Sequence, residues 1–259
     1  MKRIIQVACL GLLLFICNFT IAQPKKYSIA NAHSHNDYLN PAPFHSAYKN
    51  GFASIEADIF PVNGKLVVAH SKKEINTENT LGKLYLDPLN RELSSDPARR
   101  IKLLVDIKEN YNESLDLLLQ ELVPLMPLLS SPGVIKPLTI LITGTRPPPS
   151  EYTNYPVYIL FDDDLKLVHK PDEWDRVGQV SLSFTRFSAW KGEGEGEPDK
   201  EDIKKLKHTI DSVHKAGKTI RFWAAPDNVA SWRVQKKLGV DLIGTDRIDE
   251  LGMFLRNQR

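Results

Sequence analysis

The chain has 259 residues, with 34 Lys and Arg against 32 Asp and Glu and a formal net charge of +2 at neutral pH. This near balance gives no general reason to expect a nucleic-acid partner, because binding to a phosphate backbone requires clustered cations. A chain of this length can bury a large core, and it fits one α/β barrel or two small domains.

Residues 1–22 have the pattern of a signal peptide. Two cations precede the almost unbroken apolar run 4–15, and Thr-Ile-Ala offers small residues for cleavage before Gln23. The run is short for a membrane-spanning helix, which needs roughly 18 or more apolar residues. The sequence therefore predicts an exported protein, periplasmic or secreted, whose mature part, residues 23–259, contains no cysteine and is not stably inserted in a membrane.

Short apolar runs predict nine strands in the mature chain. The runs IKLLVDI, PLTILIT and PVYILF are continuous rather than alternating, as expected of strands that are covered on both faces. The predicted strands lie near residues 28–33, 53–59, 65–70, 102–107, 138–143, 157–161, 180–184, 219–224 and 241–244.

Apolar spacing predicts helices between these strands. They cover about residues 115–123, 202–217 and 229–238, and the last two end at a glycine. The low-complexity segment 191–200, KGEGEGEPDK, reads as a flexible exposed loop. Strands that alternate with helices, without a linker-like change in composition, predict a single (β/α)₈ TIM-type barrel over residues 23–259.

Histidines gather where the first strands end. The segment 31–40, NAHSHNDYLN, places His33 and His35 beside an asparagine and an aspartate, and His70 ends the run GKLVVAH. His33 and His35 point the same way from an extended chain, so both could line one site. Histidines in such a position suit general acid and base catalysis near neutral pH. The remaining histidines read as surface residues: His45, His169, His208 and His214.

Three acids are candidate ligands of a metal ion. Glu56 and Asp58 share one face of the strand ASIEADIF, and Asp106 follows the apolar run KLLV. Without a cation, Asp106 would be buried and unpaired, which is costly. Carboxylates that converge at the carboxyl ends of barrel strands suit a hard divalent cation, Mg²⁺ or Ca²⁺. The alternative, exposed acids on an ordinary strand, fits less well because apolar residues alternate with Glu56 and Asp58.

These motifs resemble, in order, those of the phospholipase C-like phosphodiesterase superfamily. SHNDYL, residues 34–39, is similar to the SHNTYL that opens the catalytic barrel of eukaryotic phosphoinositide phospholipases C. IEAD and NGKLVVAH resemble the Glu-x-Asp and histidine motifs of glycerophosphodiester phosphodiesterases. LLVDIKEN resembles their Glu-Ile-Lys strand, with Asp106 in place of the acid, as in the spider-venom sphingomyelinases D. IRFWAAPDN and LGVDLIGTDRIDEL are similar to their last two strands, so the resemblance covers about residues 31–251.

The resemblance implies a metal-dependent phosphoric diester hydrolase that uses histidine acid–base catalysis. It makes His35 and His70 the acid/base pair. His33 stays an alternative to His35, because it follows an alanine as the histidine of the phosphodiesterases' Ala-His-Arg-Gly does. The metal ligands that the resemblance implies are Glu56, Asp58, Asp106 and Asn36.

The resemblance leaves the substrate open between a glycerophosphodiester and a phospholipid headgroup. The arginine that follows the first histidine in the phosphodiesterases is absent, as is their Pro-Glu-Asn metal ligand. Lys108, Arg146 and Arg221 lie near strand ends and could replace this positive charge at the phosphate. Trp223 could form an apolar wall beside the leaving alcohol. The partner expected is thus a small-molecule or lipid phosphodiester.

Three other functions are considered. A phospholipase D-like lyase of the same superfamily is kept open by the match at Asp106. A glycoside hydrolase that uses two carboxylates would leave His35 and His70 without a role. A non-catalytic binding barrel has no physical need for these histidines and acids.

Overall fold

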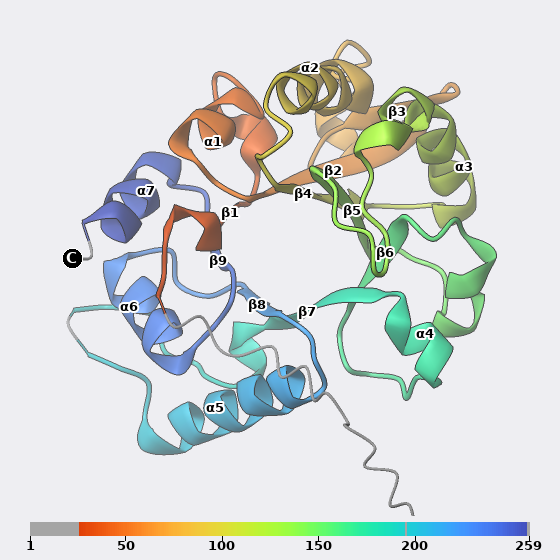
Figure 1. Cartoon of the computed structure of the whole chain (residues 1–259). Coiled ribbons are helices and arrows are strands. Elements are labelled where there is room, and N and C mark those ends of the chain that lie inside the picture. The colour runs from red at the N-terminus through yellow and green to blue at the C-terminus, as the bar shows by residue number, and fades with distance from the viewer. Residues whose placement is uncertain (1–25, 195, 258–259) are drawn as a thin grey trace, which may run out of the picture.

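The computed structural model describes residues 26–194 and 196–257. Eight parallel strands form a nearly closed barrel (Figure 1), in the order β8-β7-β6-β5-β4-β2-β1-β9. The predicted (β/α)₈ barrel is therefore confirmed. The parallel strands are β1 (Ala32–Ser34), β2 (Ser54–Val62), β4 (Ile101–Ile107), β5 (Leu138–Gly144), β6 (Ile159–Asp163), β7 (Val177–Ser183), β8 (Ile220–Trp223) and β9 (Ile243–Thr245).

Helices connect the strands and surround the barrel (Figure 1). The predicted helices 115–123, 202–217 and 229–238 correspond to α3, α5 and α6. α3 begins earlier than predicted because Asn110 caps its first turn, and α5 begins after the cap Asp199. The helices are α1 (His45–Asn50), α2 (Asp87–Ser95), α3 (Tyr111–Glu121), α4 (Pro171–Asp175), α5 (Lys200–Lys215), α6 (Val229–Leu238) and α7 (Ile248–Arg256).

The predicted signal peptide and its cleavage site lie outside the described residues. Within residues 26–194 and 196–257, no helix combines the length and the apolar character that crossing a membrane requires.

The first predicted strand, residues 28–33, is wrong over most of its length. Ile29–Asn31 forms a single 3₁₀ turn, and only Ala32–Ser34 is a strand. The Ser28 hydroxyl accepts a hydrogen bond from the amide of Ala30 at 3.3 Å, and the Asn31 side chain accepts one from the Ser28 amide at 2.9 Å. These side chain to backbone bonds offer the chain a turn in place of a sheet ladder.

The predicted strand 65–70 is found as β3 (Lys65–Val68), which pairs antiparallel with β2 and lies outside the barrel order. Asn63 and Gly64 both have positive φ, as a two-residue hairpin turn requires. The hairpin folds the chain back along β2, where the amide of Ala69 donates to the carbonyl of Asp58 at 3.2 Å. This return places His70 beside the acids of β2.

The barrel is held least tightly between β8 and β9. A single bridge, Arg221 to Leu242, pairs the two strands. Asp241 reinforces this seam, because its carboxylate accepts from the amide of Ile220 and contacts Nε2 of His214, both at 2.8 Å. The prediction that His214 is a surface residue is therefore wrong: it is buried and connects α5 to the seam.

A chain of polar side chains crosses the barrel interior. Nζ of Lys102 on β4 donates to Oε1 of Gln179 on β7 at 2.7 Å, although β4 and β7 are not neighbours in the sheet. Gln179 then donates to the hydroxyl of Ser181 at 3.0 Å, and Nε of Arg221 donates to the same hydroxyl at 3.4 Å. Burial lowers the pKa of Lys102 to about 8.

The lowered pKa of Lys102 predicts a dependence of stability on pH. Lys102 keeps its proton up to about pH 10.5 in the unfolded chain but only up to about pH 8 in the folded chain. The free-energy cost of removing this proton on folding therefore falls as the pH rises from about 8 to about 10.5. From pH 7 to pH 10 the unfolding free energy of the parent should rise by about 1–3 kcal/mol relative to that of Lys102→Met. Urea unfolding of both proteins measures the difference, and a constant difference would contradict the assignment.

Candidate active site

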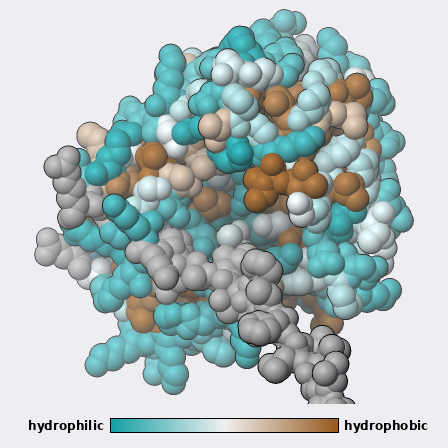
Figure 2. Space-filling view, viewed as in Figure 1, coloured by the Kyte–Doolittle hydropathy of each residue, from teal (hydrophilic) through white to brown (hydrophobic). Residues whose placement is uncertain are grey.

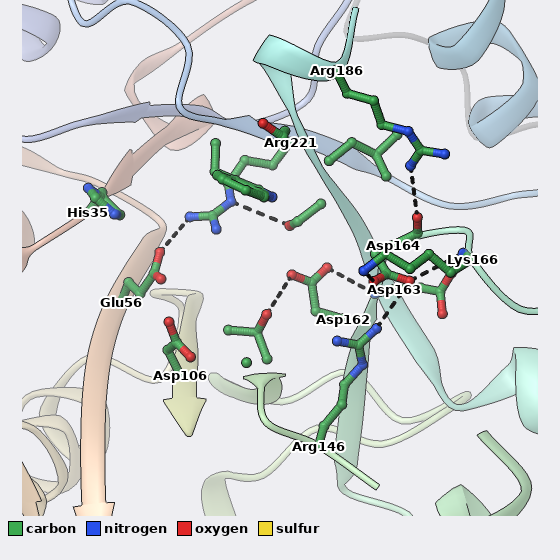
Figure 3. A pocket seen from close by; sticks show the side chains of 16 residues that line it. His35, Glu56, Asp106, Arg146, Asp162, Asp163, Asp164, Lys166, Arg186 and Arg221 are labelled. Carbon is green, nitrogen blue, oxygen red and sulfur yellow. Dashed lines mark hydrogen bonds and ion pairs between the residues drawn. The ribbon is translucent and has the colours of Figure 1, made fainter. Parts of the chain in front are cut away.

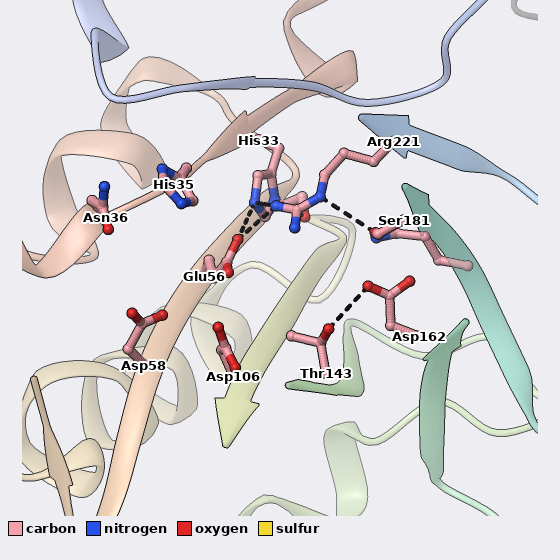
Figure 4. Close-up of polar contacts among 12 residues, drawn as sticks. His33, His35, Asn36, Glu56, Asp58, Asp106, Thr143, Asp162, Ser181 and Arg221 are labelled. Carbon is pink, nitrogen blue, oxygen red and sulfur yellow. Dashed lines mark hydrogen bonds and ion pairs between the residues drawn. The ribbon is translucent and has the colours of Figure 1, made fainter. Parts of the chain in front are cut away.

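Three carboxylates converge at the carboxyl ends of two neighbouring strands. Glu56 and Asp58 are on β2, and Asp58 lies opposite Asp106 of β4 in the strand register. One oxygen from each of the three side chains lies within 4.8 Å of the others (Figure 4). The structure thus brings the three predicted ligands together at a place that could hold a metal ion.

A lysine lies between two of these acids. Nζ of Lys108 is 2.6 Å from Oδ2 of Asp58 and 2.7 Å from Oδ2 of Asp106. The expectation that Asp106 would be unpaired without a cation is therefore wrong, because the next inward-facing residue of its own chain supplies an ammonium group. Burial nevertheless raises the pKa of Asp106, and the charges of Asp58 and Glu56 raise it further against the effect of Lys108. The site favours positive charge.

Glu56 is fixed by a buried ion pair. NH1 of Arg221 on β8 lies 2.6 Å from Oε2 of Glu56, and both side chains are about 5% exposed. Burial alone would raise the pKa of Glu56, but the Arg221 guanidinium outweighs it and holds that pKa well below its usual range. Arg221, which was expected to bind the phosphate, is thus first the counter-ion of Glu56.

His33 is enclosed behind this pair. Its Nδ1 lies 2.7 Å from the hydroxyl of Ser54, and its Nε2 lies 2.8 Å from Oε2 of Glu56 and contacts Arg221. The side chain is fully buried. Burial, together with the charge of Arg221, lowers the pKa of His33 to about 3, so the imidazole is neutral at physiological pH. Both of its ring nitrogens are engaged.

His35 is the more open of the two histidines. Its side chain is 41% exposed, and its Nδ1 lies 2.7 Å from Oδ1 of Asp246. Burial lowers the pKa of His35, but the hydrogen bond to Asp246 and the charge of Glu56 raise it more, so the net shift is upward. Asp246 was not among the predicted residues, although it is the aspartate of the Thr-Asp pair that ends the last strand motif.

Tyr38 connects three predicted residues and was itself missed. Its hydroxyl lies 2.8 Å from Oδ2 of Asp58, 2.9 Å from Oδ1 of Asn36 and 3.2 Å from Nδ1 of His70. Nδ1 of His70 is also 3.2 Å from Asp58. Asn36 adopts a left-handed backbone conformation, with φ of 47°, and its amide also reaches Asp246. The sequence signal for Tyr38 was its place in SHNDYL.

A cavity of about 450 Å³ opens beside these groups (Figure 3). The opposite wall of the cavity contains both cations and acids, which form ion pairs. Arg146 lies 3.6 Å from Asp164, and Lys166 is 2.6 Å from the same carboxyl group. Asp162, whose pKa burial raises to about 6, also lines the cavity. The half-exposed Trp223 completes the wall, where an apolar surface was predicted.

The predicted residues divide into three groups. Those that line the cavity are His35, Glu56, Asp106, Arg146, Arg221 and Trp223. Lys108 and Asp58 are joined to it through the contact between Lys108 and Asp106, and Asn36 and His70 are joined to Asp58 through Tyr38. His33 lies behind Glu56.

Removing one member of the buried ion pair should be costly. Arg221→Met would leave the charge of Glu56 buried without a partner, so the unfolding free energy should fall by about 3–5 kcal/mol. Adding Glu56→Gln removes that charge and should recover part of the loss. Arg91→Met, at an exposed arginine of α2, is the control and should change stability by no more than about 0.5 kcal/mol. Equal losses in Arg221→Met and Arg91→Met, measured by urea unfolding, would contradict the role of the pair.

Comparison with known proteins gives a family model and several relatives that resemble this chain. Residues 25–96 match the family model of the AIM6-like phosphodiesterase domain. The chain is 25% identical over 280 residues to Altered inheritance of mitochondria protein 6 of Eremothecium gossypii. This match covers 87% of this chain and 69% of that protein. It is 25% identical over 262 residues to the homologue of Arthroderma benhamiae, covering 84% and 81% of the two chains.

Two solved structures share the fold at low sequence identity. A glycerophosphodiester phosphodiesterase from Parabacteroides distasonis has a TM-score of 0.60 and 13% identity over 90% of this chain and 99% of that one. A calcium-dependent phosphoinositol-specific phospholipase C from a Pseudomonas species has a TM-score of 0.58 and 12% identity over 88% and 93%. The predicted resemblance to the phospholipase C-like phosphodiesterases is confirmed.

Proposed function

We propose that the protein is a metal-dependent phosphodiesterase that cleaves a glycerophosphodiester or a phospholipid headgroup. The observation that carries this proposal is that His35, held by Asp246, and the acids Glu56 and Asp106 line one cavity at the carboxyl ends of the barrel strands. In (β/α)₈ barrels this end carries the active site. The cationic residues of the opposite wall, among them Arg146, Lys166 and Arg186, suit an anionic substrate.

The acids fit a divalent cation. Three carboxylates whose oxygens approach within 4.8 Å form the hard, oxygen-rich donor set that Mg²⁺ and Ca²⁺ prefer. The ammonium of Lys108, which lies between Asp58 and Asp106, supports a preference for positive charge at this place. Glu56, Asp58 and Asp106 would hold the ion, with the amide oxygen of Asn36 as a further ligand. When bound, such an ion supplies Lewis-acid stabilisation of the charge on the phosphate oxygens.

The histidines would move the protons. One of His35 and His70 takes the proton of the attacking hydroxyl as its oxygen bonds to phosphorus. The other gives a proton to the leaving oxygen as its bond to phosphorus breaks. Asp246 fixes the ring of His35 through Nδ1, and Tyr38 and Asp58 do the same for His70. Attack by the substrate's own hydroxyl gives a cyclic phosphate, and a phospholipase D-like lyase would use the same residues.

We also propose that the protein is exported, which rests on the sequence of residues 1–22. The mature chain would begin at Gln23 and meet its substrate in the periplasm or outside the cell. The balanced charge of the chain supports a small-molecule or lipid phosphodiester rather than nucleic acid as the partner.

Removal of metal should abolish activity. The mature protein should hydrolyse bis-p-nitrophenyl phosphate, lose this activity in EDTA and regain it with Mg²⁺ or Ca²⁺. Asp58→Asn and Asp106→Asn should raise the metal concentration that gives half-maximal activity by about tenfold or more, because each removes a charged ligand. Asp116→Asn, on an exposed part of α3, is the matched control. Activity that survives EDTA, or a panel of phosphodiesters without any turnover, would contradict the proposal.

The two neighbouring histidines should differ in what their loss affects. His35→Ala should reduce turnover by about 10²-fold or more, as expected for a lost proton-transfer group. His33→Ala should cost less activity but lower the unfolding free energy, because His33 is buried against Glu56 and Ser54. His208→Ala on exposed α5 should change neither quantity. If His33→Ala lost more activity than His35→Ala with unchanged stability, the catalytic assignment would belong to His33.

A further inference from the structure

A loop with an apolar tip lies at the mouth of the candidate active site. Residues 164–170 join β6 to α4, so they lie at the same end of the barrel as the acids. Leu167 is 59% exposed and Val168 is 98% exposed, and Leu165 beside them is also exposed. Apolar side chains gathered on one exposed loop indicate a surface that is covered by something else.

The loop is held so that its tip projects. The buried carboxylate of Asp163 contacts both ends of it: Oδ1 accepts from the amide of Leu165 at 2.7 Å, and Oδ2 lies 2.8 Å from Nε2 of His169. The His169 side chain is only 4% exposed, so the prediction that it is a surface residue is wrong. Leu165 has φ of 56°, in the left-handed region that an apolar side chain rarely adopts. One buried acid thus fixes the loop base and leaves Leu167 and Val168 outside.

The tip is continuous with the candidate active site. A second hollow of about 360 Å³ lies between this loop and the segment after β5, and its walls include Leu167 and the three prolines 147–149. It shares Arg146, Asp163, Asp164 and Lys166 with the catalytic cavity (Figure 3). The hollow therefore joins the charged wall, through side chains that both spaces share, to the prolines and Leu167 next to the exposed tip. A charged region followed by an apolar one is the order of charge and apolar surface in a phospholipid.

Two lysines flank the apolar tip, and each lies beside an acid. Nζ of Lys166 is 2.6 Å from Asp164 and Nζ of Lys170 is 3.6 Å from Glu173, but both lysine side chains are more than two-thirds exposed and so remain open to a further anion. Lysines beside inserted apolar groups favour an anionic lipid surface. Two or three apolar side chains offer far less area than the roughly 800 Å² per partner of a stable protein interface, whereas a lipid surface needs no such complementarity.

We propose that the loop 164–170 docks the protein reversibly on a bilayer of anionic phospholipid. Leu167 and Val168 enter between the headgroups, and Lys166 and Lys170 lie against the lipid phosphates. The proposal rests on the proposed function, because it selects a bilayer phospholipid, rather than a water-soluble phosphodiester, as the substrate of the same site.

Vesicle sedimentation of the mature protein tests the docking surface. The parent should bind vesicles of phosphatidylglycerol and phosphatidylcholine in equal parts. Leu167→Gln combined with Val168→Asn should weaken binding by about tenfold or more, and Lys166→Gln combined with Lys170→Gln should weaken it and reduce its salt dependence. The loop variants should keep the melting temperature of the parent.

A second exposed apolar surface provides the matched control. Ile135, 83% exposed, precedes β5 and therefore lies at the opposite end of the barrel. Figure 2 shows apolar side chains gathered near β5 and β6 on the face in view. Ile135→Gln should bind vesicles as the parent does. The proposal would be overturned if Ile135→Gln weakened binding as much as the loop variants do, or if the loop variants bound normally. It would also be overturned if the parent did not bind vesicles, or changed its oligomeric state instead of binding them.

The failure of docking can be told from the failure of the proposed function. Turnover of bis-p-nitrophenyl phosphate by the parent reports on the catalytic site without any lipid. Turnover together with vesicle binding that does not depend on the loop overturns the docking surface alone. Loop-dependent binding without turnover of any phosphodiester overturns the proposed function and leaves the docking surface in place.

Discussion

The buried ion pair between Glu56 and Arg221 is the interaction on which the rest of the site depends. It joins β2 to β8 across the barrel interior, next to the seam where β8 and β9 share a single bridge. Two charges buried this deeply are tolerated only when each has a partner and further hydrogen bonds. Arg221 donates one to the hydroxyl of Ser181, and Nε2 of His33 contacts Oε2 of Glu56. Glu56 therefore stays ionised in the wall of a cavity that would otherwise favour its neutral form.

The buried ion pair also distinguishes His33 from His35, the two histidines of the segment 31–40. His33 lies in β1 and His35 follows directly after this strand, but only His33 contacts the ion pair, where burial and the charge of Arg221 keep it neutral. His35 lines the cavity, where Asp246 holds its ring and the side chain stays partly exposed. Two histidines that are two positions apart thus lie in different surroundings, one fully buried and one partly open to the cavity. The proposal that His35 rather than His33 transfers protons rests on this difference in access, because both residues are of the same type.

Much of the architecture could be predicted from the sequence because it depends on local patterns. Continuous apolar runs such as IKLLVDI indicate covered strands, and alternation along ASIEADIF places Glu56 and Asp58 on one face. What could not be predicted depends on contacts between residues far apart in the chain. Arg221 is 165 positions from Glu56, and Asp246 is 211 positions from His35. No spacing along the sequence reveals which of several strand-end cations pairs with an acid and which remains for the substrate. The same holds for His214 and His169, whose buried partners Asp241 and Asp163 are fixed only by the fold.

The central claim is that Glu56, Asp58 and Asp106 form a cation site beside His35, and that Lys108 balances the charge of the acids when no cation is bound. Anomalous diffraction from crystals grown with Mn²⁺ tests this most directly. We expect a single anomalous peak within about 2.0–2.6 Å of an oxygen of each acid, with Nζ of Lys108 moved away from Asp58 and Asp106. A map without a peak at the acids, in which Lys108 still lies between Asp58 and Asp106, would contradict it.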